Sequence, residues 1–160
     1  VAHLGLGLVA LGAVGAGAWK SETIQYVDKG QSIAVAGRTA KLVDVVEGKG
    51  PNYVYERGEF AVTGPRGEVS RLAAERRFYP VRGMQTTEAG YATGPLGDVY
   101  VSIGERKEGK GWVVRLWRHP LVSWLWLGIA LTAFGGFLAL APAPKRRTAA
   151  VRAAAPAMAE

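Results

Sequence analysis

Cysteine is absent from the 160-residue sequence, and only two histidines, His3 and His119, are present. Without cysteine, this chain has no disulfide, no thiolate metal ligand and no cysteine nucleophile. The stretch between the two histidines also lacks a Gly-x-Ser-x-Gly motif, a glycine-rich phosphate loop and a histidine pair at metal-binding spacing. We therefore expect no hydrolase or metalloenzyme site of a common type in this middle part.

Charged residues are missing from the apolar run at 120–140, PLVSWLWLGIALTAFGGFLAL, and a basic cluster follows at 145–147. About 20 apolar residues are enough to cross a bilayer as a helix. A basic cluster just beyond such a run marks its cytoplasmic end, and tryptophan favours the opposite interface. The tryptophans at that opposite end are Trp117, Trp124 and Trp126.

This pattern predicts a transmembrane helix over 117–141 and a basic, disordered cytoplasmic tail over 142–160. The part before the helix is then extracytoplasmic. The net charge is +7, and four of those charges come from the membrane flank and tail, where five basic residues stand against one acid. The excess fits a positive-inside anchor and not a nucleic-acid-binding patch. Those six residues are Arg118, Lys145, Arg146, Arg147, Arg152 and Glu160.

A second apolar run, residues 1–19, is rich in small residues, and we expect it to be a transmembrane helix that begins before Val1. One face of that helix carries His3, Gly7, Ala10, Val14 and Gly17. Small residues let helices approach closely in a bilayer, so we expect this face to pack. His3 could ligate a haem iron or relay protons, or it could form a hydrogen bond to a neighbouring helix.

Residues 20–116 show turn residues every 8–12 positions, which is typical of short antiparallel strands. The fold class that we predict is therefore membrane α plus all-β: two transmembrane helices flank a small antiparallel β-barrel or sandwich as an outer domain. About seven strands are expected, at 21–27, 31–36, 39–47, 53–62, 68–79, 98–103 and 112–116.

Three arginines in the stretch at 75–82, Arg76, Arg77 and Arg82, are candidate contacts for an acidic partner or a haem propionate, because the guanidinium fork matches carboxylates. The alternative is an ordinary exposed strand. His119 lies just before the predicted helix, at the outer membrane interface. We expect it to be an amphipathic residue that flanks this helix, with no ligand role.

Several sequence motifs resemble those of one protein family and occur in the same order along the chain. Residues 76–90, RRFYPVRGMQTTEAG, resemble the outer C-terminal domain of CcmF, the cytochrome c maturation haem lyase. Residues 98–105, DVYVSIGE, look like the next segment of that family, and residues 120–128 are similar to its membrane entry. The start, Ala2-His3-Leu4-Gly5, resembles the helix that precedes the domain.

The resemblance implies that this chain is the C-terminal part of a polytopic haem lyase of the bacterial inner membrane, with its central domain in the periplasm. Such a protein attaches haem to apocytochrome c on the outer side. His3 matches a family histidine that ligates a resident b-type haem, so it would be an axial ligand to the haem iron, and the second ligand would lie outside this chain. The implied partners are other cytochrome c maturation membrane proteins, a haem chaperone, apocytochrome c and membrane lipid.

The family's tryptophan-rich outer segment and its other haem-ligating histidines are missing here, so these residues alone are not expected to be catalytic. A second hypothesis stays open. The chain could be a non-catalytic, membrane-tethered β domain that binds a partner protein or ligand, with His3 structural and Arg76 and Arg77 in the contact surface.

Overall fold

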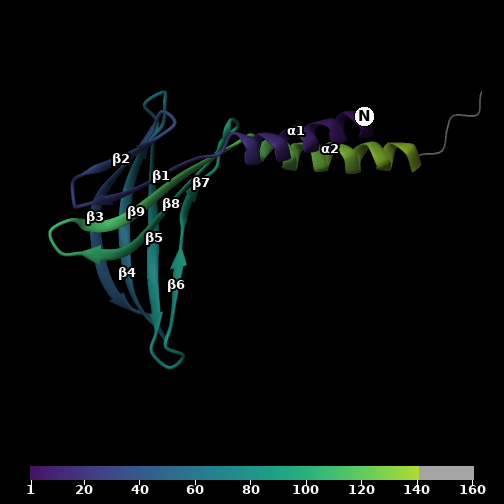
Figure 1. Ribbon diagram of the computed structural model, residues 1–160. Helices are drawn as coiled ribbons and strands as arrows, with labels where there is room; N and C mark the ends of the chain where they lie inside the picture. The colour runs from purple at the N-terminus through teal and green to yellow at the C-terminus, as the bar shows by residue number, and fades with distance from the viewer. Residues whose placement is uncertain (141–160) are drawn as a thin grey trace, which may run out of the picture.

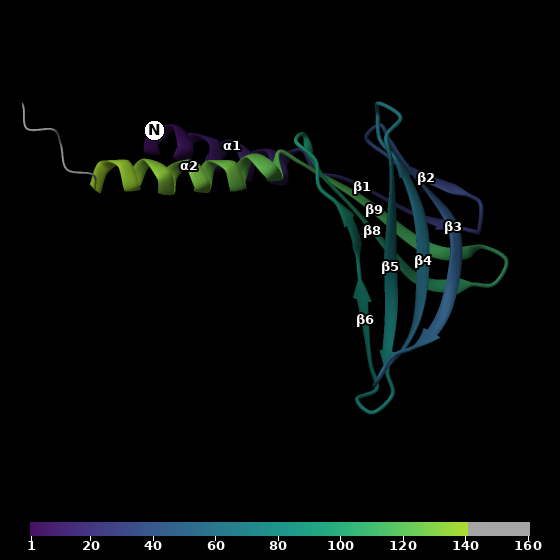
Figure 2. The same cartoon turned by 180° about the vertical axis from the view of Figure 1, so that it is seen from behind.

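Two helices lie side by side and a β-sandwich projects from one end of the pair, as the computed structural model shows (Figure 1). The structure describes residues 1–140, so the basic tail predicted at 142–160 lies outside the described residues. One set of strands runs across the axis of the helix pair, whereas the strands that join the helices continue obliquely from its end, and the opposite view shows the same arrangement (Figure 2).

The two apolar runs form helix α1 (Ala2–Ala18) and helix α2 (Val122–Leu140). Among residues 1–140, α2 is the one helix that is long and apolar enough to cross a bilayer. At about 1.5 Å per residue, its 19 residues reach about 28 Å, close to the hydrocarbon thickness of a membrane. Helix α1 is also apolar but has only 17 residues, so its role as a second transmembrane helix stays a prediction.

A four-stranded antiparallel sheet has the strand order β1-β9-β8-β7. It includes both ends of the domain, because the first and last strands pair from Ser21–Arg118 to Val27–Trp112. This pairing brings α1 and α2 to the same end of the sandwich. The strands are β1 (Ser21–Val27), β7 (Gly90–Ala92), β8 (Gly97–Lys107) and β9 (Gly111–Pro120).

The facing five-stranded sheet has the order β2-β3-β4-β5-β6 and is a continuous antiparallel meander. Nine strands are present in residues 1–140 where about seven were expected. The two additional strands, β6 and β7, come from the stretch after Pro80, where the chain passes from one sheet to the other at Ala89. The strands of this sheet are β2 (Ser32–Val35), β3 (Arg38–Lys49), β4 (Val54–Thr63), β5 (Val69–Tyr79) and β6 (Met84–Glu88).

Alternating apolar residues of both sheets form the core between them. Strand β8 contributes Val99, Val101 and Ile103, all at most 1% exposed, and Phe60 of β4 reaches toward them from the other sheet. Side chains alternate between the two faces of a strand, so this period-2 pattern buries one face and exposes the other. The remaining buried apolar residues are Val27, Ile33, Val35, Ala40, Leu42, Val62, Ala74, Trp112, Val114 and Leu116.

The boundary expected between residues 116 and 117 is wrong, because β9 continues to Pro120. Trp117 is not the first residue of the helix; it lies in the sheet between Glu22 of β1 and Tyr100 of β8. Backbone pairing on both sides keeps this segment extended. Leu121, with a φ of 60°, then turns the chain from the strand into α2.

The start of α2 is attached to the loop between β7 and β8. The Ser123 hydroxyl donates a hydrogen bond to the Gly94 carbonyl at 2.7 Å. The Trp124 indole N–H donates to the Pro95 carbonyl at 3.0 Å. These two bonds fix the orientation of the sandwich relative to the helix.

Candidate functional site

Helix α1 packs against α2 through glycines. A Cβ atom placed on Gly12 would lie 2.5 Å from the Leu125 backbone nitrogen, and one on Gly5 would lie 2.5 Å from that of Thr132. On α2, a Cβ on Gly128 would lie 2.5 Å from the Val9 nitrogen. Real Cβ atoms do not approach backbone so closely. The helix backbones therefore touch at positions where only glycine fits.

The face of α1 that carries His3 points away from α2. His3, Gly7, Ala10, Val14 and Gly17 are all exposed in the described chain, and nothing lies within 4 Å of a Cβ placed on Gly7 or Gly17. The expectation that this face packs is therefore wrong for the helix pair, which uses the opposite face. Both faces of α1 carry small residues, so the sequence alone does not distinguish them.

This small-residue face leaves the His3 imidazole accessible from the side opposite α2. Gly7, Ala10 and Gly17 give this face little side-chain bulk except at Val14, which is 59% exposed, and such a face suits a flat group or another helix. Residues 1–140 contain no cluster of three or more histidine, cysteine, aspartate or glutamate side chains that could hold a metal ion. A metal bound at His3 therefore needs a further ligand from outside the described residues.

Arg76 and Arg77 of β5 point to opposite faces of the five-stranded sheet, as neighbours in a strand must. On the inner face, Arg76 contacts Glu56 at 3.0 Å and Glu105 at 3.7 Å. On the outer face, Arg77 contacts Glu75 at 2.8 Å and Glu88 at 3.4 Å. The two adjacent arginines thus do not form one joint anion site, and each already has a carboxylate partner.

Glu75 is the centre of the network on the outer face. It is 8% exposed and accepts hydrogen bonds from Arg57 at 2.6 Å and from Arg77 at 2.8 Å. Burial would raise the pKa of Glu75, but the hydrogen bonds and charges of the two arginines outweigh burial and hold the pKa below its ordinary value. The guanidinium groups also stack on Tyr55 and Tyr53. The network holds the Arg77 side chain against Glu75.

Arg82 lies in the turn between β5 and β6, next to Val81, which is 95% exposed. Among residues 1–140, Arg82 forms no ion pair, in contrast to Arg76 and Arg77. Of the three predicted contact residues, Arg82 is therefore the one whose guanidinium is open to an outside carboxylate.

A polar and aromatic cluster on the outer face of the four-stranded sheet was missed by sequence reasoning. The Tyr100 hydroxyl donates to Asp98 at 3.4 Å, and the ring of His119 meets that of Tyr100 edge-on at 5.5 Å. Burial, followed by the charge of Asp98, raises the pKa of Tyr100. The alternation at 98–103 puts Asp98 and Tyr100 on one face, but only the β8–β9 register brings His119 beside them. His119 is thus packed within the sheet surface and is not a flank residue of a membrane helix.

Comparison with protein families gives a match to the model described as CcmF C-terminal β-sandwich, over residues 18–120. The cytochrome c-type biogenesis protein ccl1 of Rhodobacter capsulatus is 40% identical over 153 residues, covering 96% of this chain and 23% of the relative. The cytochrome c-type biogenesis protein CcmF of Haemophilus influenzae is 31% identical over 140 residues, covering 88% of this chain and 22% of its own length. The chain thus spans less than a quarter of these relatives.

Among solved structures, a cytochrome c haem lyase CcmF is similar, with a TM-score of 0.66 and 19% sequence identity. The match covers 88% of this chain and 24% of that protein. At this identity the likeness concerns the fold, and it extends beyond the sandwich to most of the described chain.

Proposed function

The chain belongs to the CcmF C-terminal β-sandwich family, and from this premise we propose that it is the C-terminal part of a cytochrome c maturation haem lyase. In that role it helps a larger membrane protein attach haem to apocytochrome c. The relatives that it matches are cytochrome c-type biogenesis proteins more than four times its length. The residues described here contribute to the site without being catalytic themselves.

His3 is the residue that we propose as an axial ligand to a resident b-type haem. The observation that carries this assignment is the position of His3 on the α1 face opposite α2, beside Gly7 and Ala10. A neutral imidazole is a common axial ligand, and small neighbours leave room for a macrocycle next to the helix. The second axial ligand then comes from a part of the protein outside this chain.

A haem held in this way supplies one-electron transfer, at a potential that its ligands and burial determine. The contribution of this chain is to hold the imidazole in a fixed position. The glycine contacts between α1 and α2 fix the helix that carries His3, and the Ser123 and Trp124 hydrogen bonds fix α2 to the sandwich. The proposed haem ligand is thereby linked to the outer domain through α2.

The proposed location is the bacterial inner membrane, with the sandwich on the periplasmic side and the C-terminus in the cytoplasm. The apolar length of α2 and the basic residues at 145–147 support this orientation. The proposed partners are other maturation membrane proteins, a haem chaperone, apocytochrome c and lipid. Arg82 is the arginine best suited to contact a carboxylate of a partner or a haem propionate.

The test is the visible spectrum of the full-length membrane protein that contains this chain, oxidised and reduced with dithionite, before and after His3→Ala. We expect the wild type to show a two-histidine b-type spectrum and the variant to lose it while still inserting. His119→Ala is the matched control, because His119 is the other histidine of the chain and should leave the spectrum unchanged.

A colourless wild-type protein, purified from cells with ample haem, would favour the alternative of a tethered β domain that binds a partner. Retained haem in His3→Ala would refute the ligand assignment but leave the family role standing.

A further inference from the structure

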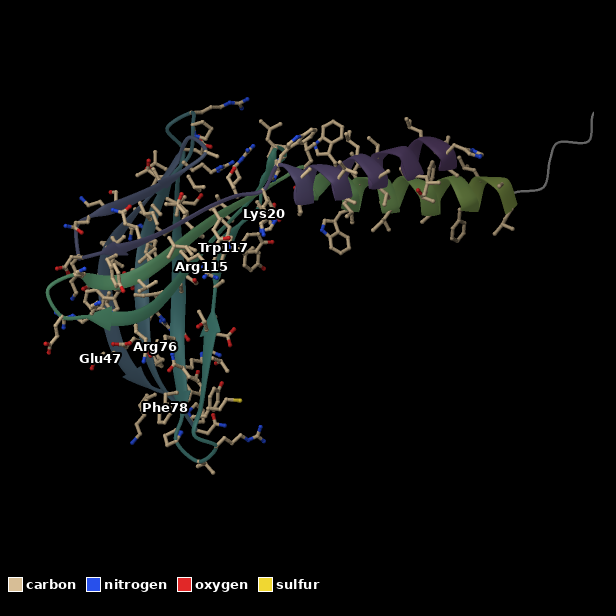
Figure 3. The ribbon with its side chains drawn as sticks, in the orientation of Figure 1. Lys20, Glu47, Arg76, Phe78, Arg115 and Trp117 are labelled. Carbon is tan, nitrogen blue, oxygen red and sulfur yellow. The ribbon has the colours of Figure 1, made fainter. Side chains whose placement is uncertain are left out.

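An aromatic cluster lies on the outer face of the four-stranded sheet, near the helices. It consists of Tyr91 of β7, Tyr100 of β8 and Trp117 of β9, which are direct neighbours across the three strands. The rings of Tyr91 and Tyr100 stack at 5.9 Å, and Tyr91 is 62% exposed. In Figure 3, Trp117 and Lys20 lie at the helix end of the sandwich, whereas Phe78 lies at the far end.

A small pocket opens within this aromatic cluster. It has a volume of about 210 Å³ and is lined by Ala89, Tyr100, Trp117 and His119. The ring of His119 meets that of Tyr100 edge-on and supports it from the side. Pockets for drug-sized ligands measure about 300–1,000 Å³, so this pocket suits a small group of atoms and not a whole cofactor.

A buried carboxylate lies beside the pocket. Asp98 is 4% exposed, and its Oδ1 atom has no hydrogen-bond partner within residues 1–140. Its Oδ2 atom accepts a hydrogen bond at 3.4 Å from the hydroxyl of Tyr100, one of the residues that line the pocket. A buried charge is costly without a partner, and the faces of aromatic rings attract cations. The chemical complement of the pocket is therefore a small organic cation.

The neighbouring basic side chains do not supply that cation. Arg115 contacts Glu22 at 3.1 Å, and Arg118 donates to a backbone carbonyl of the β7–β8 loop at 3.4 Å. Lys20 is exposed and forms no ion pair in the described part of the chain. It directly precedes the β1–β9 pairing, which begins at Ser21 and Arg118, so it lies at the same end of the sheet. A ligand that carries a cation for the buried carboxylate and an anion for Lys20 fits both groups.

The contacts between the sandwich and α2 place the pocket close to the proposed membrane surface. The hydrogen bonds of Ser123 and Trp124 join the first turn of α2 to Gly94 and Pro95. Tyr91 is three residues before Gly94, which is at most about 10 Å of extended chain. The polar headgroup layer is about 5–7 Å thick on each side of the hydrocarbon core, and tryptophan and tyrosine favour this layer. A membrane crossed by α2 therefore brings lipid headgroups to the aromatic cluster.

We propose that this pocket binds the headgroup of a zwitterionic phospholipid, phosphatidylethanolamine, from the outer leaflet. The ammonium lies against the rings of Tyr100 and Trp117 and is attracted by the Asp98 carboxylate, while the lipid phosphate faces Lys20. A primary ammonium also offers N–H donors, which the Oδ1 atom of Asp98 lacks. This inference rests on the proposed function, which places α2 across the membrane and the sandwich on its outer side.

The experiment uses the full-length membrane protein that contains this chain, with Tyr91 replaced by the photo-crosslinker p-benzoylphenylalanine. The protein is placed in nanodiscs that contain equal amounts of phosphatidylethanolamine and phosphatidylglycerol, whose headgroup has no cation. After irradiation, trypsin releases residues 83–106 as one peptide, and its mass identifies the captured lipid. We expect lipid adducts with about a fivefold excess of phosphatidylethanolamine.

Three changes sharpen the result. In the crosslinker protein, Asp98→Asn should reduce the excess to about equal capture of the two lipids, whereas Glu59→Gln, a matched change of an exposed acid on the other sheet, should leave the excess unchanged. Lys20→Glu, at an exposed position that does not threaten folding, should lower the total lipid adduct at least about twofold. The crosslinker at Tyr26, on the same sheet face but at the end away from the helices, should capture no lipid.

The proposal is overturned if the crosslinker at Tyr91 captures protein instead of lipid, if it captures the two lipids equally, or if Asp98→Asn keeps the excess. An unchanged lipid yield in Lys20→Glu would refute the phosphate contact. The haem spectrum of the same nanodiscs separates these results from the proposed function. Haem without a lipid preference would refute the headgroup pocket, whereas a lipid preference without haem would refute the ligand role of His3.

Discussion

The helix pair and the sandwich are held together by different kinds of contact. In the sandwich, large side chains such as Phe60 and Ile103 fill the space between two sheets. In the helix pair, the contact consists of glycines, and the backbones of α1 and α2 touch directly. The first arrangement gains stability from removal of apolar surface from water, whereas lipid is as apolar as leucine and would offer the helix pair no such gain at its proposed location in the membrane. Close van der Waals contact has to replace it.

The same comparison explains where exposed apolar residues are found. On α2, Trp126, Phe134 and Phe137 are exposed in the described chain, as expected if the outer surface of this candidate membrane helix meets lipid. On the sandwich, Phe78 and Val54 are exposed although they belong to a face that is buried elsewhere in the same strands. An exposed apolar side chain is therefore ordinary on the helices and informative on the sheet.

The largest loss of stability is expected from a substitution in the sandwich core. Phe60→Ala should destabilise the domain by about 3–5 kcal/mol, because a fully buried aromatic ring is replaced by a cavity between the sheets. Hydrogen–deuterium exchange of peptides from β8, in the full-length protein, measures the loss. Unchanged protection of β8 would show that the two sheets do not depend on this contact.

A smaller loss of stability is expected from a substitution between the two helices. Its cause is an added side chain for which there is no room, and not a cavity. Gly12→Leu should separate α1 from α2 at a cost of about 1–3 kcal/mol, because its side chain would occupy the backbone position of Leu125. Spin labels at the exposed positions Leu11 and Leu127 report the separation. Gly7→Leu is the matched control and should leave the label distance unchanged, since a Cβ at Gly7 meets nothing. Equal effects of the two variants would contradict the assignment of the α1 faces.

The smallest loss of stability is expected from a substitution on the polar surface of the sandwich. Glu75→Gln should cost about 1–2 kcal/mol at neutral pH, after allowance for the solvent exposure of Arg57. The folded state lowers the pKa of Glu75 below its ordinary 4.5, so its contribution is complete above that pH and is lost as the pH falls through the folded-state pKa. The stability difference between wild type and variant should therefore shrink below about pH 4.5. A difference that stays constant down to pH 3 would contradict this account.

Local sequence patterns predicted the strands well, because alternation is a property of neighbouring residues. Strand β1 has the predicted bounds, Ser21–Val27, and β8 contains the predicted segment 98–103. Which strand pairs with which was not predictable from these local patterns. The turn at 28–30 looks like a hairpin, but β1 pairs with β9 at the other end of the domain. The end of β9 was misplaced because Trp117 suits a strand and a membrane interface equally well.

In the candidate site, too, the sequence predicted which residues matter but not which of them lie side by side. Sequence reasoning identified Arg76, Arg77 and Arg82 as a group, but only the register of β4 against β5 reveals that Glu56 lies opposite Arg76. The cluster around His119 likewise depends on long-range pairing. The exposure of Val54 and Phe78 was not predictable either, since both residues continue the alternation of a normal core strand.

The central claim, that His3 of this family member ligates haem from the free face of α1, is tested most directly by His3→Gly in the full-length protein with added imidazole. The account predicts that the reduced two-histidine spectrum disappears in the variant and returns when millimolar imidazole enters the space of the missing side chain. A variant that keeps the wild-type spectrum without imidazole would contradict the account.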